Sequence, residues 1–323
     1  MSEHPRGTDE FDLIERIRAR VVARDDVMLG IGDDAAIVQV PAGQQLVIAT
    51  DTLNAGVHFP ADTAPADIGW KALAVNLSDL AAMAAQPAWC TLSLSLPHAD
   101  AAWLDAFLDG FLDLAAQHRV TLVGGDTTRG PPSICVTVHG LVAPGRALRR
   151  DGARVGDEVW VSGTLGDAAG GLAQWRAGGA IDASLRARLD RPTPRICTGL
   201  ALAEVAHAGI DVSDGLLADL GHICRASDVG AQVELARLPV SAALRAAYAE
   251  SERHALQATG GDDYELCFTT PPQARATIGR IAAETGTALT RIGRIVAGSG
   301  VQAFTAAGTA WIPDRAGYAH FAG

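Results

Sequence analysis

Hydrophobic and polar residues follow two different periods along this chain. A period near 3.6 residues predicts amphipathic helices over FDLIERIRARV (11–21), over residues 65–85 with a proline in the first turn, and over DAAWLDAFLDGFLDLAAQH (100–118). Short apolar or alternating runs predict strands. In the first half of the chain these runs are AAIVQV (35–40) and QLVIAT (45–50) around the turn PAGQ, AWCTLSLSL (88–96), VTLVGG (120–125) and SICVTVHGLVA (133–143).

The pattern begins again after a charged, glycine-containing segment, PGRALRRDGARVGD (144–157). Strands are predicted at EVWVSG, IDVS, AQVEL, YELCF and LTRIGRIV, and helices at GDAAGGLAQWRAG, RICTGLALAEVAHAG and GLLADLGHICRAS. We therefore expect an α/β or α+β protein of two domains, residues 1–148 and 149–323.

Composition narrows the class of protein. The chain has 323 residues, 48% hydrophobic content and a formal net charge of −11. No long Lys/Arg stripe occurs, which argues against a nucleic-acid or membrane-surface binder. The polar N-terminus and the absence of an uninterrupted apolar span predict neither a signal peptide nor a transmembrane helix. Five scattered cysteines without a C-x-x-C motif are expected to be buried reduced thiols of a cytoplasmic protein, in neither a zinc site nor a disulfide.

Acidic residues recur beside glycine or at strand ends, where α/β proteins place ligand sites. The motifs are GIGDD, ATDT, GGDTT, DVSDG and GGDDYE, with Asp33, Asp34, Asp51, Asp126, Asp211, Asp214, Asp262 and Asp263. A single Gly-Asp pair is an ordinary turn, but the repetition favours a shared site. Asp79 lies in the otherwise apolar helix KALAVNLSDLAAMAA, where it either faces solvent or turns toward a cation.

A cluster of carboxylates without paired His or Cys suits Mg²⁺ shared with substrate phosphates. His207, His222 and His254 show no zinc spacing and are expected to be structural or surface residues. The sequence lacks a P-loop, a protein-kinase motif set and a G-x-S-x-G elbow. SGTLGDAAGGL (162–172) does not have dinucleotide-binding spacing, although a helix N-terminus there could receive an anion.

Taken together, the motifs resemble those of bacterial thiamine-monophosphate kinases, in order and from about residue 11 to 321. They are GIGDDAA, TDTLNAGVHF, KALAVNLSDLAAM, LVGGDTTRG, GRALRR, DVSDGL, GGDDYELCF and GYAHF. The resemblance places the chain among the aminoimidazole-ribonucleotide synthetase-like ATP enzymes. It implies a homodimer whose N-terminal domains pair their strands into a β-barrel and bind ATP and Mg²⁺. A C-terminal α/β domain would complete the active-site cleft.

The resemblance also implies a role for each matching residue. Several Mg²⁺ ions would be held by Asp34, Thr50, Asp51, Asp79, Asp126, Asp211 and Asp214. ATP would contact Gly125, Asp126, Arg150 and Ser213, and thiamine phosphate would contact His58, Asp262 and Tyr318. Asp33 would either cap the turn or contact Asp34 without binding the metal itself. The sequence departs from the family pattern at Ala49, where some relatives have a hydroxyl, and at Asp262, where relatives often have the longer Glu.

The implied reaction is ATP plus thiamine monophosphate giving ADP plus thiamine diphosphate. The acceptor phosphate is already ionised near pH 7, because its second pKa is about 6, so no general base is needed. Tyr318 and Trp311 are candidates for an aromatic wall beside the thiamine rings, with core packing the favoured role for Trp311.

The sequence leaves other activities as alternatives. Selenophosphate synthetase would need a reactive residue near the N-terminus, and no cysteine precedes Cys90. The hydrogenase maturation relative ends in a cysteine-containing tail, whereas this sequence ends in HFAG. A metal-dependent phosphohydrolase and a non-enzymatic ligand sensor remain as alternatives from other classes.

Overall fold

The computed structural model describes residues 10–315, 317 and 318, which form two compact units. The first unit comprises the chain up to Leu77 together with Pro87–Leu141. The second comprises Ser78–Gln86 and the chain from Val142 onward. Both units contain helices and strands, so the α/β character expected from the sequence is confirmed.

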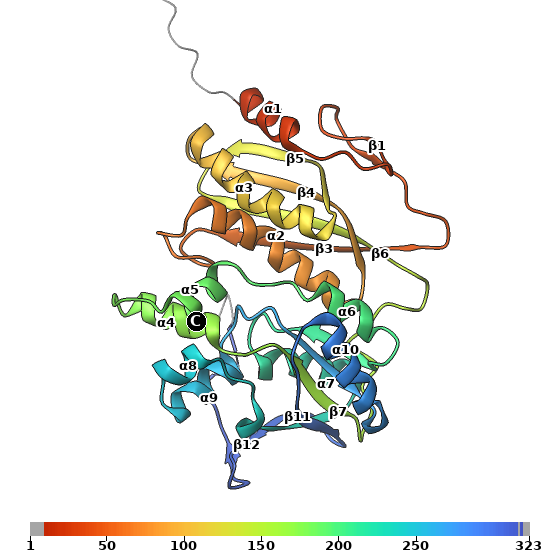
Figure 1. Cartoon of the computed structure of the whole chain (residues 1–323), viewed down its shortest axis with the longest axis vertical. Helices are drawn as coiled ribbons and strands as arrows, with labels where there is room; N and C mark the ends of the chain where they lie inside the picture. The colour runs from red at the N-terminus through yellow and green to blue at the C-terminus, as the bar shows by residue number, and fades with distance from the viewer. Residues whose placement is uncertain (1–9, 316, 319–323) are drawn as a thin grey trace, which may run out of the picture. The chain divides into compact units, whose positions relative to one another are not determined.

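The first unit is built on a four-stranded sheet with the order β3-β6-β4-β5 (Figure 1). Its elements are α1 (Glu10–Arg20), β1 (Val27–Leu29), β2 (Ile37–Val38), β3 (Gln45–Asn54), α2 (Pro65–Ala82, whose last turn belongs to the second unit), β4 (Gln86–Leu96), α3 (Ala101–His118), β5 (Thr121–Arg129) and β6 (Ser133–Val142). The predicted strands 35–40 and 45–50 both exist. However, β2 pairs with β1 in a separate two-stranded sheet, and β3 joins the larger one.

Helices α2 and α3 lie on one face of this sheet (Figure 1). Their backbones approach closely where glycines stand: a Cβ on Gly69 would collide with the backbone of Phe107, and one on Gly110 with the backbone of Ala66. The side chain of Asp100 caps α3 by accepting the backbone N–H of Trp103 at 3.0 Å. The contacts at Gly69 and Gly110 pack the N-terminal end of α2 tightly against α3.

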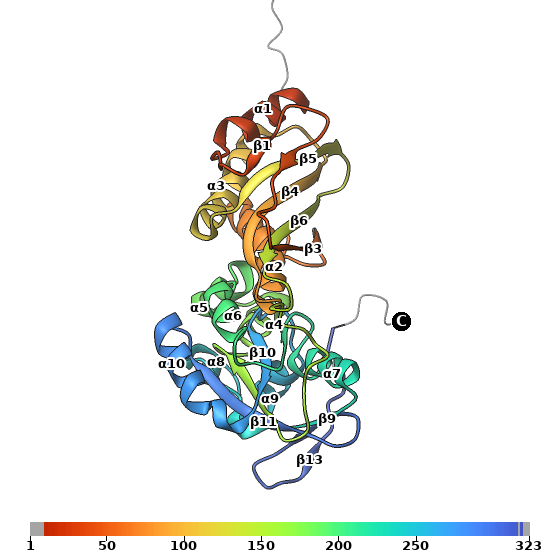
Figure 2. The ribbon, with the colours of Figure 1, turned by 90° about the vertical axis from the view of Figure 1, so that its right-hand side faces the viewer.

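The second unit contains a seven-stranded sheet with the order β13-β12-β9-β11-β7-β10-β8. Its elements are β7 (Glu158–Ser162), α4 (Asp167–Arg176), α5 (Ala183–Asp190), α6 (Ile196–Leu202), β8 (Ala208–Asp211), α7 (Leu216–Ser227), β9 (Gly230–Glu234), α8 (Ala242–Ala247), α9 (Glu250–Thr259), β10 (Leu266–Thr270), α10 (Arg275–Thr285), β11 (Leu289–Val296), β12 (Gly300–Phe304) and β13 (Ala310–Trp311). The neighbouring strands run antiparallel except β9 and β12, which are parallel. Figure 2 shows α7 on the side of this unit away from α10.

The core of the second unit is formed by α7 and the sheet. The apolar side of α7 contributes Leu216, Leu220 and Ile223, which are fully buried among sheet residues such as Val161. Trp311 is partly buried against this core, in agreement with the expected packing role. The predicted helix 195–209 is wrong in its second half, because the chain after α6 pairs with β10 as strand β8.

All five cysteines are free. Cys90, Cys224 and Cys267 are buried as expected, but Cys135 is half-buried and Cys197 is exposed, so the expectation of buried thiols fails for these two residues. Within the described part of the chain, no helix is long and apolar enough to cross a membrane.

Candidate functional site

The connection between β8 and α7 carries the DVSDGL motif in the second unit. Asp211 ends β8 and is 4% exposed. Its Oδ2 accepts a hydrogen bond from the hydroxyl of Ser78 at 2.8 Å. Asp79, the next residue of α2, is half-buried and belongs to the same unit. The fold therefore brings the turn that carries Asp79 to the strand end that carries Asp211.

Asp219, in the first turn of α7, lies behind this motif. It is 3% exposed, and its Oδ2 accepts three backbone N–H groups, those of Ser213, Asp214 and Gly215, at 3.0–3.1 Å. Burial, followed by the negative charges of Asp211 and Asp214, raises the pKa of Asp219 to about 7. Three carboxyl groups, those of Asp211, Asp214 and Asp219, therefore lie close together around the β8–α7 connection.

In the first unit, Thr50 and Asp51 are consecutive in β3 and therefore face opposite sides of the sheet. The hydroxyl of Thr50 donates to the carbonyl of Val136 at 3.0 Å. The backbone N–H of Asp51 donates to Oδ1 of the buried Asn76 on α2 at 2.9 Å. The carboxylate of Asp51 is half-buried, and the Asn76 contact fixes the strand position from which it projects.

The GIGDD turn and the GGDTT strand also belong to the first unit. Asp34 and Asp126 are both exposed. Asp33 Oδ1 accepts the backbone N–H of Asp34 at 2.8 Å. Gly125 has φ of 156°, and any side chain there would collide with the carbonyl of Leu92, so Asp126 follows a position where only glycine fits.

Contacts of both its ring and its backbone hold His58 within the first unit. Its Nδ1 accepts the backbone N–H of Asn54 at 3.0 Å, and its carbonyl accepts from Nζ of Lys71 at 2.9 Å. A neutral imidazole that accepts at Nδ1 carries its proton on Nε2. His58 can therefore present an N–H donor from its second ring nitrogen.

Lys71 was not singled out by the sequence patterns. It is the only lysine in the chain, the other basic residues among the 26 being arginines. It is 1% exposed, which is rare for an ammonium group unless it is fully paired. A lysine inside an otherwise apolar helical pattern was the signal that could have identified it.

Arg150, Asp262 and Tyr318 lie in the second unit. Arg150 is exposed, and its carbonyl accepts from Ser227 Oγ at 2.8 Å. Asp262 has φ of +68°, and its Oδ1 accepts from the hydroxyl of Tyr264 at 3.1 Å. Tyr318 is 48% exposed.

The remaining acidic residues of GGDDYE point inward. Both carboxylate oxygens of Asp263 accept the N–H of Gly166, at 2.9 and 3.0 Å. Glu265 is fully buried and pairs with Arg188 and Arg195. These two carboxylates are structural groups, and neither was distinguishable from Asp262 by sequence alone.

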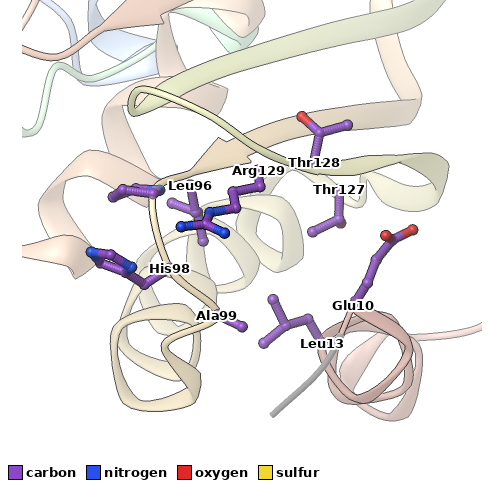
Figure 3. Close-up of a pocket in the computed structure, with 9 residues that line it drawn as sticks. Glu10, Leu13, Leu96, His98, Ala99, Thr127, Thr128 and Arg129 are labelled. Carbon is purple, nitrogen blue, oxygen red and sulfur yellow. The ribbon is translucent and has the colours of Figure 1, made fainter. Parts of the chain in front are cut away.

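A hollow of about 470 Å³ lies in the first unit beside the two threonines of the GGDTT motif (Figure 3). Its walls include Leu96, His98, Thr127 and Arg129 from the ends of β4 and β5 and the segment that follows β4. Asp126 immediately precedes this wall in β5 but does not line the hollow. The residues TTR within LVGGDTTRG are Thr127, Thr128 and Arg129, and all three line this hollow.

Among the described residues, no three His, Cys, Asp or Glu side chains converge on one point as a closed metal site would require. Hard cations such as Mg²⁺ are commonly held by only one or two carboxylates, with water and phosphate oxygens completing the shell. The donors found here are carboxylate and hydroxyl oxygens, which is the chemistry that Mg²⁺ accepts.

The chain matches the family model of the AIR synthase related protein N-terminal domain over residues 32–142 and that of the C-terminal domain over residues 154–305. It is 49% identical to the thiamine-monophosphate kinase of Escherichia coli strain K12 over 319 residues, covering 97% of this chain and 98% of the relative. The chain belongs to the thiamine-monophosphate kinase family.

Solved structures agree with this assignment. The thiamine-monophosphate kinase of Stenotrophomonas maltophilia K279a is 55% identical and superposes with a TM-score of 0.86 over 94% of this chain and 98% of that one. AaThiL complexed with AMPPCP and TMP is 32% identical, with a TM-score of 0.77 over 99% of this chain and all of that one. The family resemblance stated from the motifs is therefore confirmed.

Proposed function

We propose that the protein transfers the γ-phosphoryl group of ATP to the phosphate of thiamine monophosphate, giving ADP and thiamine diphosphate. The observation that carries this proposal is 49% identity, over nearly the full length of both chains, to a thiamine-monophosphate kinase. A 32% identical relative that binds AMPPCP and TMP supports the same pair of substrates. The sequence departs from the family motifs at Ala49 and Asp262, and it has the residue type that the motifs require at every other assigned position.

The proposed Mg²⁺ ligands come from both units. They are Asp34, Thr50, Asp51 and Asp126 in the first unit, and Asp79, Asp211 and Asp214 in the second. The crowding of Asp211, Asp214 and Asp219 supports cation binding, because the first two carboxylates add to the rise in the pKa of the third. When bound, Mg²⁺ would neutralise phosphate oxygens of both reactants and hold them together.

The chain's own residues position the reactants. We assign Gly125, Asp126, Arg150 and Ser213 to ATP, and His58, Asp262 and Tyr318 to thiamine monophosphate. The Nε2–H of His58 can donate to the acceptor phosphate, because its Nδ1 already accepts from Asn54. Tyr318 offers a half-exposed aromatic ring to the cationic thiazolium.

No residue is required to remove a proton from the acceptor. A phosphate monoester has a second pKa of about 6 and carries its own ionised oxygen at neutral pH. The alcohol of free thiamine would instead need a positioned base. We therefore expect the phosphate to be the acceptor and the free alcohol to be inert.

We further propose a homodimer in which the four-stranded sheets of two copies continue into a barrel. Strand β3 lies at an edge of its sheet, and Leu46 and Ile48 on it are exposed. An unpaired, apolar strand edge tends to pair with another chain. Sedimentation at micromolar concentration should give twice the 33.4 kDa chain mass, and a monomer throughout would contradict the proposal.

The function is tested by incubating the protein with Mg-ATP and either thiamine monophosphate or thiamine, and separating the products by chromatography. Thiamine diphosphate should form from the monophosphate only. Its formation from free thiamine at a comparable rate would show transfer to the alcohol. ADP release at the same rate with and without either acceptor would identify an ATP hydrolase instead.

A further inference from the structure

The loop Ser213–Gly215 joins β8 to α7, and a single side chain holds all its N–H groups. Oδ2 of Asp219 accepts from Ser213 and Asp214 at 3.1 Å and from Gly215 at 3.0 Å. Bonds from N–H groups to a carboxylate are stronger than those to neutral acceptors. Three of them on one buried oxygen fix the orientation of three successive peptide groups.

This arrangement determines what the loop offers to a ligand. N–H groups near a helix N-terminus commonly receive phosphate, but here Asp219 uses the three that precede α7. The loop is left to present its side chains, because its three carbonyl oxygens accept the N–H groups of Asp262, Tyr318 and Asp219. The DVSDG motif resembles an anion-binding turn, but the carboxylate of Asp219 already accepts its N–H groups.

The carbonyls on the other side of the loop hold two further segments. The carbonyl of Ser213 accepts the N–H of Asp262 at 2.9 Å, and that of Asp214 accepts the N–H of Tyr318 at 2.9 Å. The segment before Tyr318 lies against the loop, because a Cβ on Gly317 would be 2.7 Å from the Asp214 carbonyl oxygen. Two peptide groups of the loop therefore contact Asp219 on one side and the chain around Asp262 or Tyr318 on the other.

We propose that Asp219 is a positioning residue for the phosphoryl-transfer site. Its carboxylate sets the Ser213–Gly215 loop, which aims the side chain of Asp214 and anchors the backbone of Asp262 and Tyr318. The inference rests on the proposed function, which assigns Asp214 to Mg²⁺ and the other two residues to the acceptor. Asp219 contacts neither reactant and acts through the loop.

The test is Asp219→Asn, which keeps the size and an acceptor oxygen but removes the charge that strengthens the three bonds. Asp228→Asn is the matched control: Asp228 is exposed, caps the opposite end of α7 and has φ of 54°, a conformation that Asn tolerates well. Asp219→Asn should raise KM for thiamine monophosphate and the half-saturating Mg²⁺ concentration by about tenfold each, as expected for lost positioning of contacts to bound ligand. The control should change neither.

Amide hydrogen exchange of the peptide spanning residues 211–220 provides a readout that does not depend on activity. Exchange at Ser213, Asp214 and Gly215 should be slow in the parent and faster in Asp219→Asn. KM and Mg²⁺ dependence within twofold of the parent would overturn the proposal, and so would altered kinetics with unchanged exchange. If the variant does not fold, fast exchange at these three amides in the parent overturns it, and slow exchange there supports it. Absence of turnover in the parent would instead refute the proposed function.

Discussion

Ser78 donates a hydrogen bond from its hydroxyl to Oδ2 of Asp211 at 2.8 Å, and both residues are almost completely buried. This bond joins the last turns of α2, where Asp79 lies, to the end of β8. It satisfies one lone pair of a carboxylate that burial makes unfavourable. Two proposed metal ligands far apart in sequence are thereby connected within one unit.

Replacing Ser78 by Ala should lower the free energy of unfolding by about 1–3 kcal/mol, because Asp211 would lose its buried donor. The half-saturating Mg²⁺ concentration should rise as well. Urea denaturation and a Mg²⁺ titration of activity measure the two effects. Ser251→Ala, on the exposed side of α9, is the control and should leave both values unchanged; equal stabilities of the two variants would show that the bond contributes nothing.

Asp51→Asn should preserve the fold and lower turnover by at least about a hundredfold, through loss of a charged oxygen ligand for the metal. The backbone contact from Asp51 to Asn76 does not involve the altered side chain. Steady-state rates compared with circular dichroism separate activity from folding. Asp25→Asn, at an exposed turn in the same unit, is the matched control.

Chelation provides a second test of metal dependence without any substitution. Excess EDTA should abolish turnover of the parent, and added Mg²⁺ should restore it. Full activity in EDTA would contradict the assignment of all seven proposed ligands.

Lys71→Met retains most of the side-chain volume but removes the ammonium that donates to the carbonyl of His58. We expect KM for thiamine monophosphate to rise, because the loop that places the His58 ring would be held less firmly. Lys71 is the only lysine, so an amine-specific reagent has one side-chain target besides the N-terminal amine. Peptide mapping should find Lys71 modified in urea and not in the native protein. Rapid native modification would contradict the buried position.

Asp263 should make stability depend on pH. Burial raises the pKa of this carboxyl well above its ordinary value of 3.8, outweighing the opposing effects of the Gly166 N–H and Arg188. The folded protein therefore holds this proton more tightly than the unfolded chain, and stability from this group falls as pH rises above about 4.

Asp263→Asn lacks this titration. The stability of this variant relative to the parent should therefore increase between pH 4 and pH 8, because only the parent loses stability through this group. Urea denaturation at several pH values measures the difference, with Asp228→Asn as an exposed control. Parallel pH profiles for the parent and Asp263→Asn would contradict the prediction.

Local sequence patterns were sufficient to predict most of the secondary structure and the family. Helical periods over 11–21 and 100–118 correspond to α1 and α3, because the apolar side of each helix is encoded locally. The Gly-Asp motifs identified the family because they combine a restricted backbone with a specific side chain, as at Gly125 and Asp126.

Strand pairing and the roles of individual carboxylates could not be predicted, because they depend on contacts between residues distant in sequence. Strand β2 pairs with β1 and not with β3, and residues 208–211 form a strand because β10 lies beside them. The three carboxylates Asp262, Asp263 and Glu265 are alike in sequence, yet burial and the Gly166, Arg188 and Arg195 contacts give the last two structural roles. Asp219 likewise gains its importance only when the chain folds its carboxylate under the loop before α7, since no local pattern encodes three N–H groups converging on one oxygen.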